Sequence, residues 1–203
     1  MTETTCAFTG RRPKSFPWKY NEATPDCVLL KEVLAKQIKL LADRGVTDWL
    51  SGMAQGTDLW CAQIVLGLRK KNSALRLCCV LPCEDQEVKW PAPIQEQYRS
   101  ILGQVNDVIY VGRKYRRECM LKRNRWMVDH SSILLAVYNG SFRSGTGMTV
   151  RYARQLGREI YILDPIARSI SYEHIITPEL EHRKSGYVER KRRPYQGNVV
   201  RIA

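Results

Sequence analysis

The sequence lacks the two glycine-rich signatures that most often mark a nucleotide site. No G-x-G-x-x-G follows the first apolar segment, and no G-K-S or G-K-T occurs anywhere in the 203 residues. The first absence argues against the usual nicotinamide-dinucleotide turn, and the second against a triphosphate-binding Walker loop. Any nucleotide chemistry in this chain must therefore use other turns.

Long apolar runs are also missing. No run approaches the roughly 20 residues that a bilayer requires. The first residues, Met1–Thr5, show no basic start followed by an apolar stretch, as an export signal would. We therefore expect a cytoplasmic protein with no membrane partner.

Histidine is scarce, with only three in the chain, and the seven cysteines are not spaced like metal ligands. Cys79 and Cys83 have no second cysteine pair or paired histidines to complete a zinc site. Ser144 has no histidine nearby in the sequence, so no catalytic set is evident and the catalytic residues stay unknown. We expect buried free thiols, no metal ion and no cofactor.

Basic side chains outnumber acidic ones by 33 to 20, which gives this basic protein a formal charge of +13. Residues 113–125 hold seven basic side chains against one acidic, and residues 165–203 hold eight against four. Such clusters favour an anionic partner, which could be a nucleotide, a nucleic acid or an acidic protein. For Arg190–Arg193, a merely solvated surface is an equal alternative. The five tryptophans are scattered without the periodic stacking platform of single-strand binders, so we expect them in the core or a pocket wall.

Apolar periodicity predicts alternating strands and helices. Strands are expected at 5–9, 75–81, 107–111, 132–138 and 159–163, and helices at 27–44, 57–70, 94–103, 116–130 and 145–156. Asp26 is the expected N-cap of the first helix. This alternation predicts an α/β fold, a Rossmann-like three-layer sandwich with a mainly parallel sheet. We expect one domain over residues 1–165 and a basic C-terminal tail over 166–203 that is peripheral or partly disordered.

Two glycine turns stand where a strand-like segment passes into a helix-like one. They are Ser51–Asp58 and Gly140–Gly147. The first amides of a helix lack internal partners and carry a partial positive charge, so such turns suit a phosphate. Thr9–Arg12 should lie at the same edge of the sheet. Alternatively, these glycines only permit a positive φ or close helix packing.

Two further groups of residues allow alternative interpretations. Asp58, at the start of a helix, is expected to cap free amides, although it could contact a ribose hydroxyl. Arg123 and Asn124 border one helix face with Met127, and they could present a polar pair to a ligand or form part of a solvated basic helix.

Four motifs in order carry a family resemblance: Phe8–Pro13, Ser51–Asp58, Arg123–Asp129 and Ser144–Thr146. Together they resemble the YpsA-like family of the SLOG superfamily, over roughly residues 5–163. That superfamily includes the LOG phosphoribohydrolases and the DNA-processing protein DprA. The resemblance implies a Rossmann-like fold with a pocket for a nucleotide or an ADP-ribose-like ligand.

The chain departs from the pattern at three places. Arg11 stands where the family often has histidine, and Ser144 where a glycine is common. Gly147-Met148-Thr149 replaces the segment that supplies the catalytic glutamate of LOG-type hydrolases, so it is uncertain whether the protein is an enzyme.

Three functional hypotheses follow. The first is a sensor or regulator that binds a nucleotide-derived ligand at the carboxyl edge of the sheet. The second is a nucleoside-monophosphate N-glycoside hydrolase in which Asp58 or Asp129 replaces the missing glutamate. The third is a nucleic-acid-binding protein that uses the cluster at 113–125 and the tail. A homo-oligomer is left open. The predicted ligand-binding residues are Thr9, Gly10, Arg11, Gly52, Met53, Gly56, Asp58, Arg123, Asn124, Asp129, Gly140, Ser144, Gly145 and Thr146.

Overall fold

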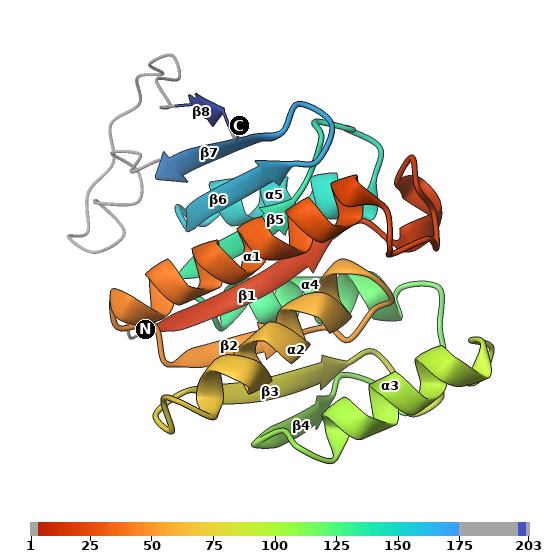
Figure 1. The fold of residues 1–203 in the computed structure, drawn as a ribbon. Coiled ribbons are helices and arrows are strands. Elements are labelled where there is room, and N and C mark those ends of the chain that lie inside the picture. The colour runs from red at the N-terminus through yellow and green to blue at the C-terminus, as the bar shows by residue number, and fades with distance from the viewer. Residues whose placement is uncertain (1–3, 175–198, 202–203) are drawn as a thin grey trace.

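One sheet forms the centre of the molecule (Figure 1). The computed structural model describes residues 4–174 and 199–201, and eight strands of these residues make up the sheet. The strands are β1 (Thr5–Gly10), β2 (Asp48–Ser51), β3 (Arg76–Leu81), β4 (Asp107–Tyr110), β5 (Ile133–Val137), β6 (Glu159–Asp164), β7 (Ser169–His174) and β8 (Val199–Arg201). Their order is β4-β3-β2-β1-β5-β6-β7-β8. Neighbours from β4 to β6 pair in parallel, whereas β7 and β8 are antiparallel additions.

Helices cover both faces of this sheet. They are the 3-10 turn η1 (Pro13–Ser15), α1 (Pro25–Asp43), α2 (Thr57–Arg69), α3 (Ala92–Leu102), α4 (Cys119–Asp129) and α5 (Gly145–Gln155). In Figure 1, α1, α2 and α3 lie on one face and α4 and α5 on the other. The predicted α/β, Rossmann-like fold with a mainly parallel sheet is therefore confirmed.

The start of α1 differs from the sequence-based expectation. Thr24, in extended conformation, is the N-cap, and its side chain accepts a hydrogen bond from the Cys27 N–H at 3.4 Å. Pro25 occupies the first helical position, where its missing N–H costs nothing. Asp26 lies inside the first turn and pairs with Arg168 at 2.5 Å. The prediction that Asp26 caps the helix was wrong because the helix begins at Pro25, two residues earlier than expected.

The core is split by the sheet into two layers. In β1, Cys6 and Phe8 face the layer under α1 and α2, while Ala7 faces the layer under α4 and α5. Every residue of β5 is buried, as expected of a central parallel strand. All seven cysteines are free and six are buried, which confirms the buried-thiol prediction. Burial raises the pKa of thiols such as Cys6, so they stay protonated and unreactive.

The direction in which the chain crosses the sheet reverses between β1 and β5. From β1 the chain moves outward through β2, β3 and β4, and it then returns to place β5 on the other side of β1. Gly10 and Val137 are register partners at the carboxyl ends of these two strands. In open α/β sheets, ligands gather in the crevice outside such a switch point.

The sheet extends beyond the predicted domain boundary at residue 165. Strand β7 pairs with β6, and Ile170 packs against the main core. Strand β8 pairs in turn with β7. Of the predicted tail, residues 175–198 and 202–203 lie outside the described residues. Within the described ranges, no helix is both long and apolar enough to cross a bilayer.

Candidate functional site

The turn between β2 and α2 is held by a buried serine. The Ser51 hydroxyl donates to the Asp58 carbonyl oxygen at 2.9 Å and accepts from the Met53 N–H at 3.2 Å. Met53 has a φ of 55° and Gly56 a φ of 87°, so the chain reverses sharply here. The left-handed conformation explains Gly56 without reference to a ligand.

Two other glycines of the predicted site are required by close packing. A Cβ on Gly10 would lie 2.4 Å from the Thr57 side chain, and a Cβ on Gly52 would lie 1.0 Å from Nη1 of Arg123. The absence of a side chain at Gly10 thus leaves room for the first turn of α2, and its absence at Gly52 leaves room for the Arg123 guanidinium of α4. For these two positions, the close-packing alternative describes what the structure shows.

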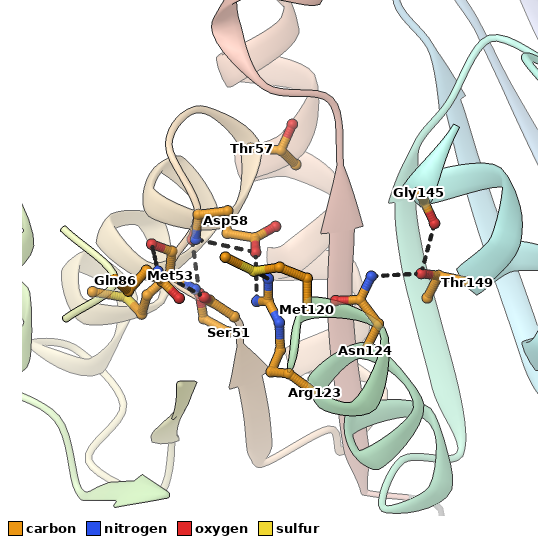
Figure 2. A network of polar contacts seen from close by, with 12 residues as sticks. Ser51, Met53, Thr57, Asp58, Gln86, Met120, Arg123, Asn124, Gly145 and Thr149 are labelled. Atoms are coloured by element: carbon orange, nitrogen blue, oxygen red, sulfur yellow. Dashed lines mark hydrogen bonds and ion pairs between the residues drawn. The ribbon is translucent and has the colours of Figure 1, made fainter. Parts of the chain in front are cut away.

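A buried ion pair lies behind the first turn (Figure 2). Arg123 Nη1 donates to Asp58 Oδ2 at 3.2 Å, although 65 residues separate them, and the two residues are 4% and 6% exposed. The Ala54 N–H also donates to Asp58 Oδ2, at 3.3 Å. Asp58 therefore closes the turn and pairs with Arg123, instead of capping α2 as predicted. Gly56 is the N-cap of that helix.

Burial sets the electrostatics of this pair. Desolvation raises the pKa of the Asp58 carboxyl, and the opposing effects of Arg123 and the Ala54 N–H do not cancel it. Desolvation likewise lowers the pKa of Arg123, against the attraction of Asp58. The exposed Arg12 lowers the pKa of both groups by its positive charge. The pair is consequently a costly arrangement that a neighbouring charge can perturb.

Arg123 has spare donors. Its Nη2 contacts only the Met120 sulfur, at 3.9 Å, and its buried Nε has no partner within residues 4–174. A buried guanidinium usually satisfies more of its five N–H groups than this. Arg123 could therefore bind a further acceptor.

Gln86 supports the same turn from the loop between β3 and α3. Its Nε2 donates to the carbonyl oxygens of Gly52 and Met53, at 3.3 and 2.7 Å, while its buried Oε1 has no partner in the described part of the chain. Sequence reasoning missed Gln86, because a lone glutamine in an aperiodic loop gives no signal.

In the second glycine turn, between β5 and α5, Ser144 is the N-cap of the helix that follows. The Ser144 hydroxyl accepts from the Gly147 N–H at 2.9 Å and donates to the Ser141 carbonyl oxygen at 2.8 Å. Gly140 has a φ of 81°. Nothing lies within 4 Å of a Cβ built on Gly145. Between residues 4 and 174, no hydrogen bond engages the N–H groups of Gly145 and Thr146, the first two residues of α5.

Arg123 and Asn124, predicted to act as a polar pair on α4, contact two different helices. Arg123 points toward α2, whereas Asn124 points toward α5, where its Nδ2 donates to Thr149 Oγ1 at 2.9 Å (Figure 2). Thr149 Oγ1 in turn donates to the Gly145 carbonyl oxygen at 3.0 Å. Asn124 also borders a cavity of about 170 Å³ between α4 and α5, lined by Leu121, Asn124, Arg125, Met148, Thr149, Arg151, Tyr152 and Gln155.

The remaining predicted residues lie at both ends of the sheet. Thr9 is buried at the end of β1, and the Arg11 carbonyl oxygen accepts from Thr57 Oγ1 at 3.3 Å. Asp129 ends α4 and accepts from the Tyr152 hydroxyl at 2.7 Å. It lies roughly 9 Å along the helix axis from Arg123, toward the amino edge of the sheet. The structure therefore brings Asp58 and Arg123 together but not Asp129.

Asn139 is a second residue that sequence reasoning missed. It follows β5 at the switch point, and its buried Oδ1 has no hydrogen-bond partner among the described residues. Buried unpaired acceptors are uncommon and often mark a place for water or a ligand. A position between a strand end and a glycine was the only sequence signal.

The fold and the two glycine turns define a Rossmann-like α/β protein with two helix N-termini beside its switch point. The model of the YpsA family, described as the YspA SLOG family, matches residues 6–166, so the chain belongs to this family. The family resemblance seen in the four motifs is thereby confirmed.

Relatives from Bacillus and Lysinibacillus share much of this length. The "Uncharacterized SPbeta prophage-derived protein YoqJ" of Bacillus subtilis is 31% identical over 70% of this chain and 91% of its own length. The "UPF0398 protein YpsA" of Bacillus subtilis is 26% identical over 66% of this chain and 78% of its own. A "UPF0398 protein" of Lysinibacillus sphaericus is 27% identical over 64% and 74%. These names state no ligand or reaction.

Proposed function

We propose that this chain binds a nucleotide-derived ligand, a nucleotide or an ADP-ribose-like molecule, at the carboxyl edge of the sheet, and that it acts as a sensor or regulator. The observation that carries the proposal is the pair of N–H groups at the start of α5, those of Gly145 and Thr146, which form no hydrogen bond within the described residues and lie beside the switch point. The Gly145 and Thr146 N–H groups would bind a phosphate there, with help from the helix dipole. Arg11 or Arg123 would neutralise it.

Binding is favoured over hydrolysis by the placement of the acids. The Asp58 carboxylate already accepts from Arg123 and from the Ala54 N–H. Asp129 lies toward the opposite edge, in a hydrogen bond with Tyr152. Neither carboxylate is therefore placed as a free acid beside the first turn of α5. We keep N-glycoside hydrolysis as the alternative that a base-release assay on Asp58→Asn would test.

A thermal-shift panel on the full chain tests the proposal. The probes are AMP, ADP, ADP-ribose, cyclic nucleotides and NAD, with inorganic phosphate as a separate arm. A ligand at 100 times its Kd stabilises by about 2.7 kcal/mol, which corresponds to roughly 5–10 °C for a chain of this size. We expect at least one nucleotide to raise Tm by that order. No shift with any nucleotide would contradict the proposal.

Gly145→Asp is the matched probe of the site. Its side chain meets open space, and an acidic residue in the first turn of a helix is favourable, so the variant should fold. It should nevertheless abolish the nucleotide shift by repelling the phosphate. Gly67→Asp on α2 is the control, because Gly67 is exposed and also has nothing within 4 Å. An equal nucleotide shift in both variants would place the ligand elsewhere.

A further inference from the structure

Several loops lie together at the carboxyl edge of the sheet. Because β1 to β5 are parallel, the segments that follow β1, β3, β4 and β5, at 11–24, 82–91, 111–118 and 138–144, all lie on the same side of the molecule (Figure 1). We call these four segments the carboxyl rim. From β4 to β5 there are four strand spacings, which is roughly 19 Å. This distance is longer than a single phosphate site needs.

The carboxyl rim carries positive charge that the described protein does not neutralise. Its ten basic residues are Arg11, Arg12, Lys14, Lys19, Lys89, Arg113, Lys114, Arg116, Arg117 and Arg143. None of them forms an ion pair within the described ranges. Several cations held near one another without partners mark a surface suited to a polyanion.

The five acidic residues of the rim do not cancel this charge. Glu22, Glu87 and Glu118 pair with Lys31, Arg99 and Lys122 of the adjoining helices. The other two, Glu84 and Asp85, lie together in the loop after β3. Positive charge is therefore strongest in the loops after β1 and β4.

Exposed aromatic rings share this rim. Tyr20, Tyr110, Tyr115 and Phe142 are between 49% and 69% exposed, and each lies in a rim loop or, for Tyr110, at the end of β4. Phe142 is held by Arg151, whose guanidinium carbon lies 4.0 Å from the ring centroid. Tyr115 directly precedes Arg116 and Arg117. The tryptophans, in contrast, pack mostly into or against the core, so they could not reveal this arrangement from the sequence.

We propose that the carboxyl rim binds single-stranded nucleic acid. Unpaired cations would contact successive phosphates, and the exposed rings would stack on bases. A single strand fits better than a duplex, because the bases of a duplex are already stacked inside it and leave the rings nothing to stack on. This proposal goes beyond the small-ligand proposal, with which it shares only Arg11 among the basic residues of the rim, and it makes its own predictions.

Fluorescence anisotropy of the full chain tests this proposal. The probes are a labelled 20-nucleotide single strand and the matching duplex, each titrated over a series of KCl concentrations. We expect the single strand to bind more tightly than the duplex, with an affinity that decreases linearly on a log–log plot against salt. Equal or tighter binding of the duplex, or no binding to either, would overturn the proposal. A rim that serves an acidic protein would give the latter result.

Charge-matched variants locate the surface. The pair Arg116→Glu and Arg117→Glu should weaken single-strand binding at least roughly tenfold and reduce the salt slope by about 2. The pair Lys70→Glu and Lys71→Glu makes the same charge change near the amino edge of the sheet and should alter affinity less than about twofold, apart from general electrostatics. Equal losses in the two pairs would show a nonspecific charge effect and overturn the assignment.

Separate variants test whether the C-terminal basic residues and the exposed aromatic rings contribute to binding. Replacing Arg190–Arg193 by alanine should retain most of the affinity, and a complete loss would assign binding to the tail instead of the rim. Tyr115→Ala and Phe142→Ala should each weaken single-strand binding by roughly five- to tenfold, because every stacked base contributes. Affinity that is unchanged in both ring variants would exclude stacking on the two most exposed rings and would overturn the argument for a single strand.

Discussion

Basic side chains at the two edges of the sheet differ in their ion pairs and hydrogen bonds. At the amino edge, Arg44 pairs with Glu159 at 2.7 Å and Arg76 with Asp107 at 3.0 Å, while Arg158 donates to main-chain carbonyl oxygens. At the carboxyl edge, the basic residues of the rim form no ion pair within the described residues, and the pair of Asp58 and Arg123 lies buried beneath them. These three arginines of the amino edge bind groups of the fold itself, whereas the basic residues of the rim have no ion-pair partner among the described residues.

The largest effect is expected from breaking the buried pair at the carboxyl edge. Arg123→Met leaves the Asp58 carboxylate buried without its partner, which should lower the free energy of unfolding by about 3–5 kcal/mol. Urea denaturation followed by circular dichroism measures this. Adding Asp58→Asn to that variant should restore a large part of the loss. A double variant as unstable as Arg123→Met alone would contradict the assignment of the cost to an unpaired charge.

A smaller effect should follow from crowding the same pair. Gly52→Ala places a methyl group 1.0 Å from the present position of Arg123 Nη1, so the guanidinium must move away from Asp58. We expect a loss of about 2–3 kcal/mol in the same urea experiment. Gly67→Ala, at an exposed position in the last turn of α2, is the control and should gain up to about 1 kcal/mol from helix propensity. Equal results for the two glycines would refute the packing role of Gly52.

Much of this architecture could be predicted from the sequence because its signals are local. Apolar periodicity placed five of the six parallel strands and five helices within a few residues, and both glycine turns fall at the carboxyl edge as expected. The distance of Asp129 from the glycine turns could also have been predicted from the sequence. It ends a helix that runs back from the carboxyl edge, so helix geometry alone separates it from the turns.

The buried details could not be predicted in the same way. The pairing of Asp58 with Arg123 depends on how α4 packs across β1 against the start of α2, and no local pattern encodes such a contact. Asn124 was expected beside Arg123, but one residue along a helix is a rotation of about 100°, which turned it toward Thr149. Aromatic residues such as Tyr115 are usually interpreted from sequence as core residues, and only the fold shows that this ring is exposed.

The smallest effect compares single arginines from the two edges. Arg44→Met at the amino edge removes the partner of Glu159, whereas Arg12→Met at the carboxyl edge breaks no ion pair within residues 4–174. We expect Arg44→Met to cost about 1 kcal/mol near pH 7 and Arg12→Met less than about 0.5 kcal/mol. Equal losses of unfolding free energy in the two variants would show that the paired arginine of the amino edge stabilises the fold no more than the unpaired arginine of the carboxyl edge.

The pH dependence should show the same contrast. Burial works against ionisation of Glu159, but its hydrogen bonds with Arg44 and Tyr161 prevail and hold its pKa below the usual value. A lowered folded-state pKa means that this stabilisation is complete above roughly pH 6 and is lost as the pH falls below the unfolded value of about 4.3. Urea midpoints measured from pH 7 to pH 3 should therefore decrease less steeply in Arg44→Met than in the wild type. Arg12→Met should depart from the wild-type curve less than Arg44→Met does, because Arg12 acts on the Asp58 carboxyl only through its charge, as the last of the causes that lower the pKa of this group. Parallel curves for Arg44→Met and the wild type would show that the amino-edge pair contributes nothing to acid sensitivity.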